Sequence, residues 1–237
     1  DNIVYSPQDS TSYYYNFNYN RQSYNHTSKT TDAQKSATNE AIMNKDFRQA
    51  INFAFDRTSY GAQGNGEDGA TKVLRNTLVP PTFVQIGDKD FGTVVGEKLV
   101  NYGSQWQGID LSDAQDPYYN PEKAKAKFAE AKQALQAKGV EFPIHLDMPV
   151  DQSSTIGVQW ASSTKQSIES ALGAENVVID LQKMSTDDLN NITYFANSAA
   201  QKDYDMSTGG WTGDYQDPST YLDTLNIKNG GSLQNFG

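Results

Sequence analysis

The sequence contains no cysteine, which excludes several kinds of site at once. Disulfides, thiol nucleophiles and cysteine-bound zinc all require that residue. Histidine is scarce as well, because His26 and His145 are the only two. They lie far apart in the chain, and neither has a metal-ligand partner at a spacing such as HxxxH. We therefore expect both to be structural or surface residues, and we predict no cofactor and no metal.

Long apolar runs and basic stripes are missing too. No stretch approaches the roughly 20 apolar residues of a membrane-spanning helix. Asp and Glu number 29 against 19 Lys and Arg, a net charge of −10. An acidic chain repels phosphate backbones, so nucleic acid is not an expected partner. No signal peptide is present, and we interpret both ends as cuts through a longer protein.

The common catalytic motifs are also lacking. The chain has no GxSxG, no GxxxxGK, and no GxGxxG that follows a strand. Asp56 and Arg57 are adjacent, and an ion pair is favoured over a catalytic role because surface pairs are common. The scattered acidic residues define no carboxylate pair. We expect a protein that is not an enzyme, with a secreted hydrolase as the alternative from another class.

The first half of the chain shows one clear helix. Residues 13–19 read YYYNFNY, which predicts a strand, and the polar residues 21–39 predict a loop. The following apolar residues have the spacing of one buried helical face. They are Phe47, Ala50, Ile51, Ala54 and Phe55. The glycine-rich residues 60–70 are expected to break this helix and form a loop.

The second half alternates between helices and strands. A helix is expected from Asn120-Pro121 to Gly139, with a good N-cap, proline at its first position and an apolar stripe. The stripe consists of Ala124, Phe128, Ala131 and Leu135. The further expected elements are a strand at 142–148, a helix at 153–172, a strand at 177–184, a helix from Ser185 through Phe195, a strand at 204–206 and a last helix after Asp217-Pro218. This order predicts an α/β domain with parallel strands and crossover helices.

Residues 209–217, GGWTGDYQD, are the best candidate for a binding site. Gly209-Gly210-Trp211 is predicted to be a tight turn just after a strand, where ligands bind in such sheets. Glycines allow another chain to approach the backbone. Trp211 offers an apolar wall, and the Asp214 carboxylate offers a strong partner for an ammonium group. The alternative is an ordinary turn. Asp217 is interpreted as a helix cap rather than a ligand.

Three segments together resemble the extracellular solute-binding proteins of family 5, the peptide/nickel class. They are NKDFRQAINFAFDR at 44–57, YNPEKAKAKFAEAKQAL at 119–135 and GWTGDYQDPSTYL at 210–222. The richness in Tyr, Asn and Gln is most similar to Gram-positive oligopeptide-binding lipoproteins of the Ami/Ali type. The resemblance implies an α/β fold: a lobe of the type II periplasmic-binding-protein class, with a mixed sheet flanked by helices. Residues 1–237 would form a single lobe, the second of two, with a hinge-proximal segment near 13–20.

The resemblance also implies a function. The expected protein is the substrate-binding lipoprotein of an ABC peptide importer, extracellular and held to the outer face of the cell membrane by a lipid anchor outside this chain. Its partners would be oligopeptides, the importer permease and the first lobe of the same protein, which lies outside this chain. A nickel chelate or haem is the alternative ligand for the same fold.

Within this family, each predicted site residue has an implied role. Asp214 matches the aspartate that pairs with the α-amino group of the peptide, and Trp211 matches the tryptophan beside it. Backbone hydrogen bonds to the peptide are implied for Gly209, Gly210 and Thr212, and Tyr215 completes the predicted site. Some members have an arginine three residues before the tryptophan. Here that residue is Thr208, which favours longer peptides whose carboxylate is not held at this point.

Overall fold

The computed structural model describes residues 8–237 as a mixture of helices and short strands. The helices are α1 (Asp32–Met43), α2 (Lys45–Ala54), α3 (Arg57–Gly69), α4 (Phe91–Leu99), α5 (Pro121–Gln136), α6 (Thr155–Leu172), α7 (Thr186–Ile192), α8 (Ser219–Leu222) and α9 (Gly231–Phe236). The strands are β1 (Ser12–Phe17), β2 (Gln85–Ile86), β3 (Lys89–Asp90), β4 (Ile144–Asp151), β5 (Val177–Met184) and β6 (Met206–Trp211). Short 3₁₀ helices are η1 (Val100–Tyr102), η2 (Ser104–Trp106) and η3 (Asp223–Leu225). No helix within residues 8–237 has the length and apolar character to cross a bilayer.

The chain divides into two compact units. Among the described residues, unit 1 holds 8–14, 57–117 and 209–231. Unit 2 holds residues 15–56, 118–208 and 232–237. Strand β1 pairs with β6 in a two-stranded sheet, and the division between the units passes through both strands. Across residues 8–237 the strands form three two-stranded sheets. The combination of these strands with many helices confirms the α/β class predicted from the sequence.

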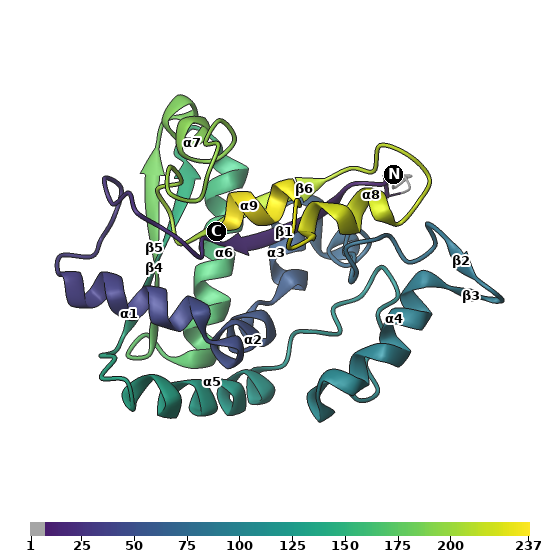
Figure 1. Cartoon of the computed structure of the whole chain (residues 1–237), viewed down its shortest axis with the longest axis horizontal. Helices are drawn as coiled ribbons and strands as arrows, with labels where there is room; N and C mark the ends of the chain where they lie inside the picture. Colours follow the sequence, from purple (N-terminus) through teal and green to yellow (C-terminus); the bar gives the residue numbers. More distant parts are fainter. Residues whose placement is uncertain (1–7) are drawn as a thin grey trace. The chain divides into compact units, whose positions relative to one another are not determined.

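Unit 2 is built around a β–α–β crossover. Strands β4 and β5 are parallel, with Ile144 opposite Val177 and Asp151 opposite Met184, and α6 connects them (Figure 1). The helix begins after the N-cap Ser154. The apolar side chains of the pair are fully buried because the helix covers the sheet. Those with no exposed surface are Ile144, Leu146, Val177 and Ile179. The predicted parallel pairing and crossover helix are confirmed.

Helices α2 and α5 pack against each other in unit 2, and both were predicted. Asn120 caps α5 by accepting from the Lys123 N–H at 2.9 Å, with proline at the first helical position. Its predicted stripe is buried as expected. Phe128 on that stripe meets Phe47 of α2 with ring centroids 6.3 Å apart. The periodicity was informative here because each helix buries one continuous face.

The predicted loop at 21–39 was wrong in its second half, because α1 begins at Asp32. Thr31 and Gln34 form a capping box at its start, in which each side chain accepts from the other residue's backbone. The helix buries only small residues and one isoleucine, namely Ala37, Thr38, Ala41 and Ile42. Its apolar signal was too weak to distinguish it from a polar loop.

The predicted loop at 60–70 was wrong over most of its length, since the helical residues of α3 continue through this stretch to Gly69, but Gly66 interrupts them with a non-helical kink (φ 68°, ψ 171°). Glycine disfavours a helix by about 1 kcal/mol relative to alanine, but tertiary contacts override that preference here. A β-carbon on Gly61 would lie 2.2 Å from the Ala70 carbonyl oxygen, so this close approach requires glycine. Asp116 accepts from the Arg57 N–H at 2.9 Å and anchors the start of the helix. Arg57 also pairs with Asp116 through its guanidinium, a structural role.

Unit 1 contains the short antiparallel pair β2–β3, with Gln85 opposite Asp90. Asp90 then caps α4 by accepting from the Thr93 N–H at 2.7 Å. In the C-terminal part of the unit, Tyr221 of α8 has no exposed surface and lies edge-on to Phe83, with ring centroids 5.3 Å apart. This buried tyrosine fixes α8 to the body of unit 1.

Unit 2 also encloses a buried ion cluster that the sequence did not reveal. Its members are Arg21, Lys29, Asp147, Asp203 and Asp205. The Arg21 guanidinium lies 2.7 Å from Asp147, 2.8 Å from Asp203 and 3.0 Å from Asp205. Lys29 lies 2.7 Å from Asp147 and also contacts Asp205. The cluster therefore ties residues 21–29 to β4 and to the segment that precedes β6.

The carboxylates of this ion cluster have shifted pKa values of opposite sign. Burial would raise the pKa of Asp147, but the charge and hydrogen bond of Lys29 outweigh it and hold the pKa to about 2. Asp205 is more deeply enclosed, and burial raises its pKa despite the nearby charges of Lys29 and Arg21. Burying charges is costly unless they are paired, so the five members depend on one another.

Candidate functional site

The predicted turn at Gly209-Gly210-Trp211 was wrong, because these residues are the last three of β6. The strand predicted at 204–206 instead begins at Met206 and continues to Trp211. Pairing with β1, nearly 200 residues earlier, keeps the glycines extended. A β-carbon on Gly210 would lie 3.0 Å from the Tyr13 ring. Glycine at this position therefore gives space to the aromatic ring of the neighbouring strand.

Strand β6 has an edge that no other strand occupies in the sheets formed by residues 8–237. The sheet has only two strands, so β1 covers one side of β6. An uncovered strand edge presents N–H and C=O groups that can pair with another extended chain. The first two residues of β6 are buried, and exposed positions begin at Thr208 and continue to the end of the strand at Trp211, three residues before Asp214.

The turn that follows β6 is held by Thr220 of α8. The Trp211 indole N–H donates to the Thr220 carbonyl at 2.7 Å. The Asp214 N–H donates to the Thr220 hydroxyl at 2.8 Å. These two bonds close the loop between β6 and α8 and fix the backbone on both sides of Gly213.

Gly213 packs tightly against α8, which makes its replacement informative. A β-carbon there would lie 2.9 Å from Thr220 Cγ2 and 3.0 Å from the Tyr221 ring, and Tyr221 is completely buried. We expect Gly213→Ala to lower the free energy of unfolding by about 1–3 kcal/mol through overpacking, measured by urea unfolding. Gly96→Ala in α4 is the control, because its β-carbon meets nothing closer than 3.9 Å. It should be neutral or slightly stabilising; equal losses in both variants would contradict the packing argument.

Asp214 and Asp217 differ in how their carboxylates are used. Asp217 accepts from the Ser219 N–H at 2.9 Å at the start of α8, and hydrogen bonds from Ser219 lower its pKa. Its carboxylate is thus used locally beside the start of α8, in line with its interpretation as a cap rather than a ligand, although Pro218 occupies the N-cap position. The Asp214 side chain is exposed, and nothing in residues 8–237 donates a hydrogen bond to its carboxylate or pairs with it. Asp214 is thus fixed by its backbone while its charge is available.

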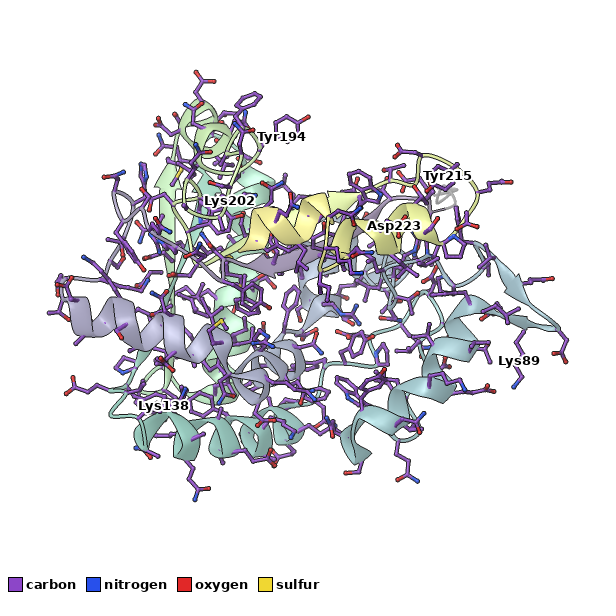
Figure 2. The ribbon with its side chains drawn as sticks, viewed as in Figure 1. Lys89, Lys138, Tyr194, Lys202, Tyr215 and Asp223 are labelled. Atoms are coloured by element: carbon purple, nitrogen blue, oxygen red, sulfur yellow. The ribbon has the colours of Figure 1, made fainter. Side chains whose placement is uncertain are left out.

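The remaining predicted site residues lie on the same segment of unit 1. Thr212 is exposed, and its hydroxyl is 2.7 Å from that of Thr11. Tyr215 is 54% exposed, and its hydroxyl lies 3.2 Å from that of Ser219 (Figure 2). Trp211, at the end of β6, is partly exposed. The segment therefore presents an aromatic side chain before and after the free Asp214 carboxylate.

The two histidines have acidic partners. His26 Nδ1 lies 3.0 Å from an oxygen of Asp203, and His145 Nδ1 lies 2.7 Å from an oxygen of Asp180. Each histidine pairs with a single aspartate side chain, as expected for a structural residue. Over residues 8–237, no group of three or more His, Cys, Asp or Glu side chains is placed to hold a metal ion.

One depression in unit 1 was not predicted from the sequence. It has a volume of about 420 Å³ and lies between α4 and residues 108–112. Gly92 and Gly96 line it, and small residues on one helical face leave such a space. None of the predicted site residues belongs to it, and it has no assigned role.

Comparison with known proteins shows the family of the chain. Residues 1–232 match the model of the bacterial extracellular solute-binding proteins, family 5. The chain is 65% identical over its whole length to the oligopeptide-binding protein AliB of Streptococcus pneumoniae. It is 62% identical over 98% of its length to the oligopeptide-binding protein SarA of Streptococcus gordonii. It spans 36% and 35% of the length of these two relatives.

Solved structures show the same fold at lower sequence identity. The substrate-binding domain of an oligopeptide ABC transporter from Bacillus anthracis matches with a TM-score of 0.63 and 20% identity. That match covers 97% of this chain and 35% of the other. Peptide-bound OppA of Listeria monocytogenes matches with a TM-score of 0.59 and 22% identity, over 98% of this chain and 36% of the other. The predicted type II periplasmic-binding-protein fold is confirmed.

Proposed function

This chain belongs to the bacterial extracellular solute-binding proteins of family 5, and we propose that it is the lobe of an oligopeptide receptor that holds the amino end of an extended peptide. The Asp214 carboxylate would pair with the α-amino group. The backbone of Gly209, Gly210 and Thr212 would pair with the peptide backbone, and Trp211 and Tyr215 would form apolar walls. The free carboxylate of Asp214, on a turn fixed by Thr220, is the observation that carries this proposal.

The chemistry of the turn supports capture of an amine. An ammonium–carboxylate hydrogen bond is about twice as strong as one between neutral groups. The indole N–H of Trp211 and the backbone N–H of Asp214 are already bound to Thr220, so they hold the loop in place. A fixed loop with one available charge loses little conformational entropy when a ligand binds.

The edge of β6 that has no strand partner among residues 8–237 supports backbone pairing. Hydrogen bonds between backbones do not depend on side-chain identity, so such a receptor accepts many sequences. The glycines of β6 leave the backbone unobstructed by side chains. Thr208 in place of an arginine leaves the peptide carboxylate without a fixed partner at that position, which suits peptides of more than one length.

The remaining proposals concern the whole receptor, of which this chain spans about a third. We place residues 1–237 in a single lobe, with the hinge-proximal segment near 13–20, and a first lobe closing over the peptide. The receptor would be an extracellular lipoprotein, anchored by a lipid outside this chain, that delivers peptides to an ABC importer permease. It would bind its substrate without chemical change. No observation on residues 8–237 favours a nickel chelate, haem or a hydrolytic site.

Calorimetry of the intact receptor with modified peptides tests this function. Peptides with scrambled sequences should bind with affinities within about tenfold of one another. N-methylation of two backbone amides that face the strand should weaken binding by about tenfold or more, because each backbone hydrogen bond contributes about 0.5–1.5 kcal/mol. N-methylation of the alternate amides is the matched control. Greater sensitivity to scrambling than to methylation would contradict backbone recognition.

A further inference from the structure

Lys202 is a nearly buried cation with no acidic partner among residues 8–237. It lies in unit 2 on the segment between α7 and β6, and only 9% of the residue is exposed (Figure 2). Arg21 and Lys29 in the same unit are even more enclosed, but each contacts at least two carboxylates. No described side chain or carbonyl accepts a hydrogen bond from the Lys202 ammonium. Within residues 8–237, Lys202 is therefore a largely enclosed positive charge that has no counter-ion and keeps only limited solvent contact at its ammonium.

The position of Lys202 is fixed by its neighbours. Its carbonyl accepts from the Asn18 amide at 2.9 Å, and its N–H donates to the Ala199 carbonyl at 3.2 Å. The ammonium lies 5.9 Å from the ring centroid of Tyr204, which is itself buried. The adjacent Asp203 and Asp205 give their carboxylates to the buried ion cluster instead. The two nearest acids in the sequence are thus already engaged.

This arrangement has an energetic cost that a suitable anion would offset. Burial lowers the pKa of the Lys202 ammonium because its charged form loses hydration. A cation–π contact recovers only part of that loss. A negatively charged group at the ammonium would restore the missing interaction, since buried charges are stable only when they are paired.

The single ammonium also indicates the class of anion. Phosphate sites generally combine several donors, such as arginine forks or successive backbone N–H groups. Lys202 offers one compact charge beside an aromatic ring, which matches a singly charged acceptor. We propose that Lys202 is the cationic half of a carboxylate-binding site. The carboxylate comes either from a bound peptide or from an acidic residue elsewhere in the intact receptor.

The direct test is NMR of this chain labelled with ¹³C at lysine. The Lys202 signals are assigned with Lys202→Met and followed during titration with acetate, at constant ionic strength maintained with chloride. Lys138 is the internal control, because it is exposed at the end of α5 and already pairs with Glu40 at 2.7 Å (Figure 2). We expect a saturable shift for Lys202 and none for Lys138. Equal responses of Lys202 and Lys138 would overturn the proposal. This outcome does not depend on the folding of Lys202→Met, because the titration is carried out on the unsubstituted chain.

Two further arms settle the anion class and its source. A response to inorganic phosphate but not to acetate would overturn the carboxylate assignment. In the intact receptor, a Lys202 shift produced by a peptide acid but not by its C-terminal amide identifies the peptide as the source. If the Lys202 signal of the intact receptor already lies at its acetate-saturated position before any ligand is added, the carboxylate comes from an acidic residue of the receptor itself. The result is separable from amine capture, because acetate has no amino group for Asp214 to bind.

Discussion

Replacing Arg21 with methionine is expected to lower the free energy of unfolding by about 3–5 kcal/mol, the range observed when one partner of a buried ion pair is removed. The side chain of Arg21 has no exposed surface and contacts three carboxylates. Methionine keeps much of the length of the arginine side chain but removes the guanidinium that pairs with the three carboxylates. Only Lys29 would then remain to balance Asp147 and Asp205. The loss is measured by urea unfolding at neutral pH.

A surface ion pair in the same unit provides the control for this result. Lys35 pairs with Asp32 three residues earlier on α1, and the Asp32 side chain is almost fully exposed. Lys35→Met should therefore change the unfolding free energy by no more than about 0.5 kcal/mol. If Arg21→Met costs no more than Lys35→Met, the ion cluster contributes nothing to holding residues 21–29 in place.

Replacing Asp214 with asparagine in the intact receptor should weaken binding of peptides with a free amino terminus by roughly 10- to 100-fold. Asparagine has nearly the same shape, so the turn held by Thr220 is kept while the charge is removed. Hydrogen bonds to charged groups contribute about 1.5–3 kcal/mol, which corresponds to this loss in affinity. Isothermal titration calorimetry measures the dissociation constant directly.

Asp217→Asn is the matched control for Asp214→Asn. The two aspartates lie on one loop, but the Asp217 carboxylate is used to cap the start of α8. Its replacement should lower stability by less than about 1 kcal/mol, because asparagine caps a helix about as well as aspartate does. It should leave peptide affinity nearly unchanged. An equal loss of affinity in both variants would indicate disruption of the loop rather than removal of a specific charge.

Elements with a strong local pattern could be predicted from the sequence. The apolar stripe of α5 has helical spacing, and its N-cap and first proline mark its start. The β4–α6–β5 crossover followed from apolar strands of the right length separated by one long helix. In each case the residues that decide the structure lie close together in the chain, so the sequence shows them directly.

Features that depend on distant contacts could not be predicted. Gly209-Gly210-Trp211 has the composition of a turn, and only pairing with β1 makes it a strand. Arg21 and Lys29 lie in a polar stretch that appeared to be solvent-exposed, yet their acidic partners come from more than 100 residues later. The segment that carries Asp214 was selected from its composition and family resemblance, which are local properties, and its role in binding stays a prediction.

The most direct test of amine capture is a two-by-two calorimetric experiment on the intact receptor. Wild type and Asp214→Asn are each titrated with one extended peptide in its free and N-acetylated forms. Acetylation removes the ammonium charge and leaves the rest of the backbone able to pair with β6. We predict that Asp214→Asn weakens the free peptide by about 1.5–3 kcal/mol and leaves the acetylated peptide unchanged, so that the two changes are coupled. Equal losses for both peptides, with no coupling energy, would contradict the assignment of Asp214.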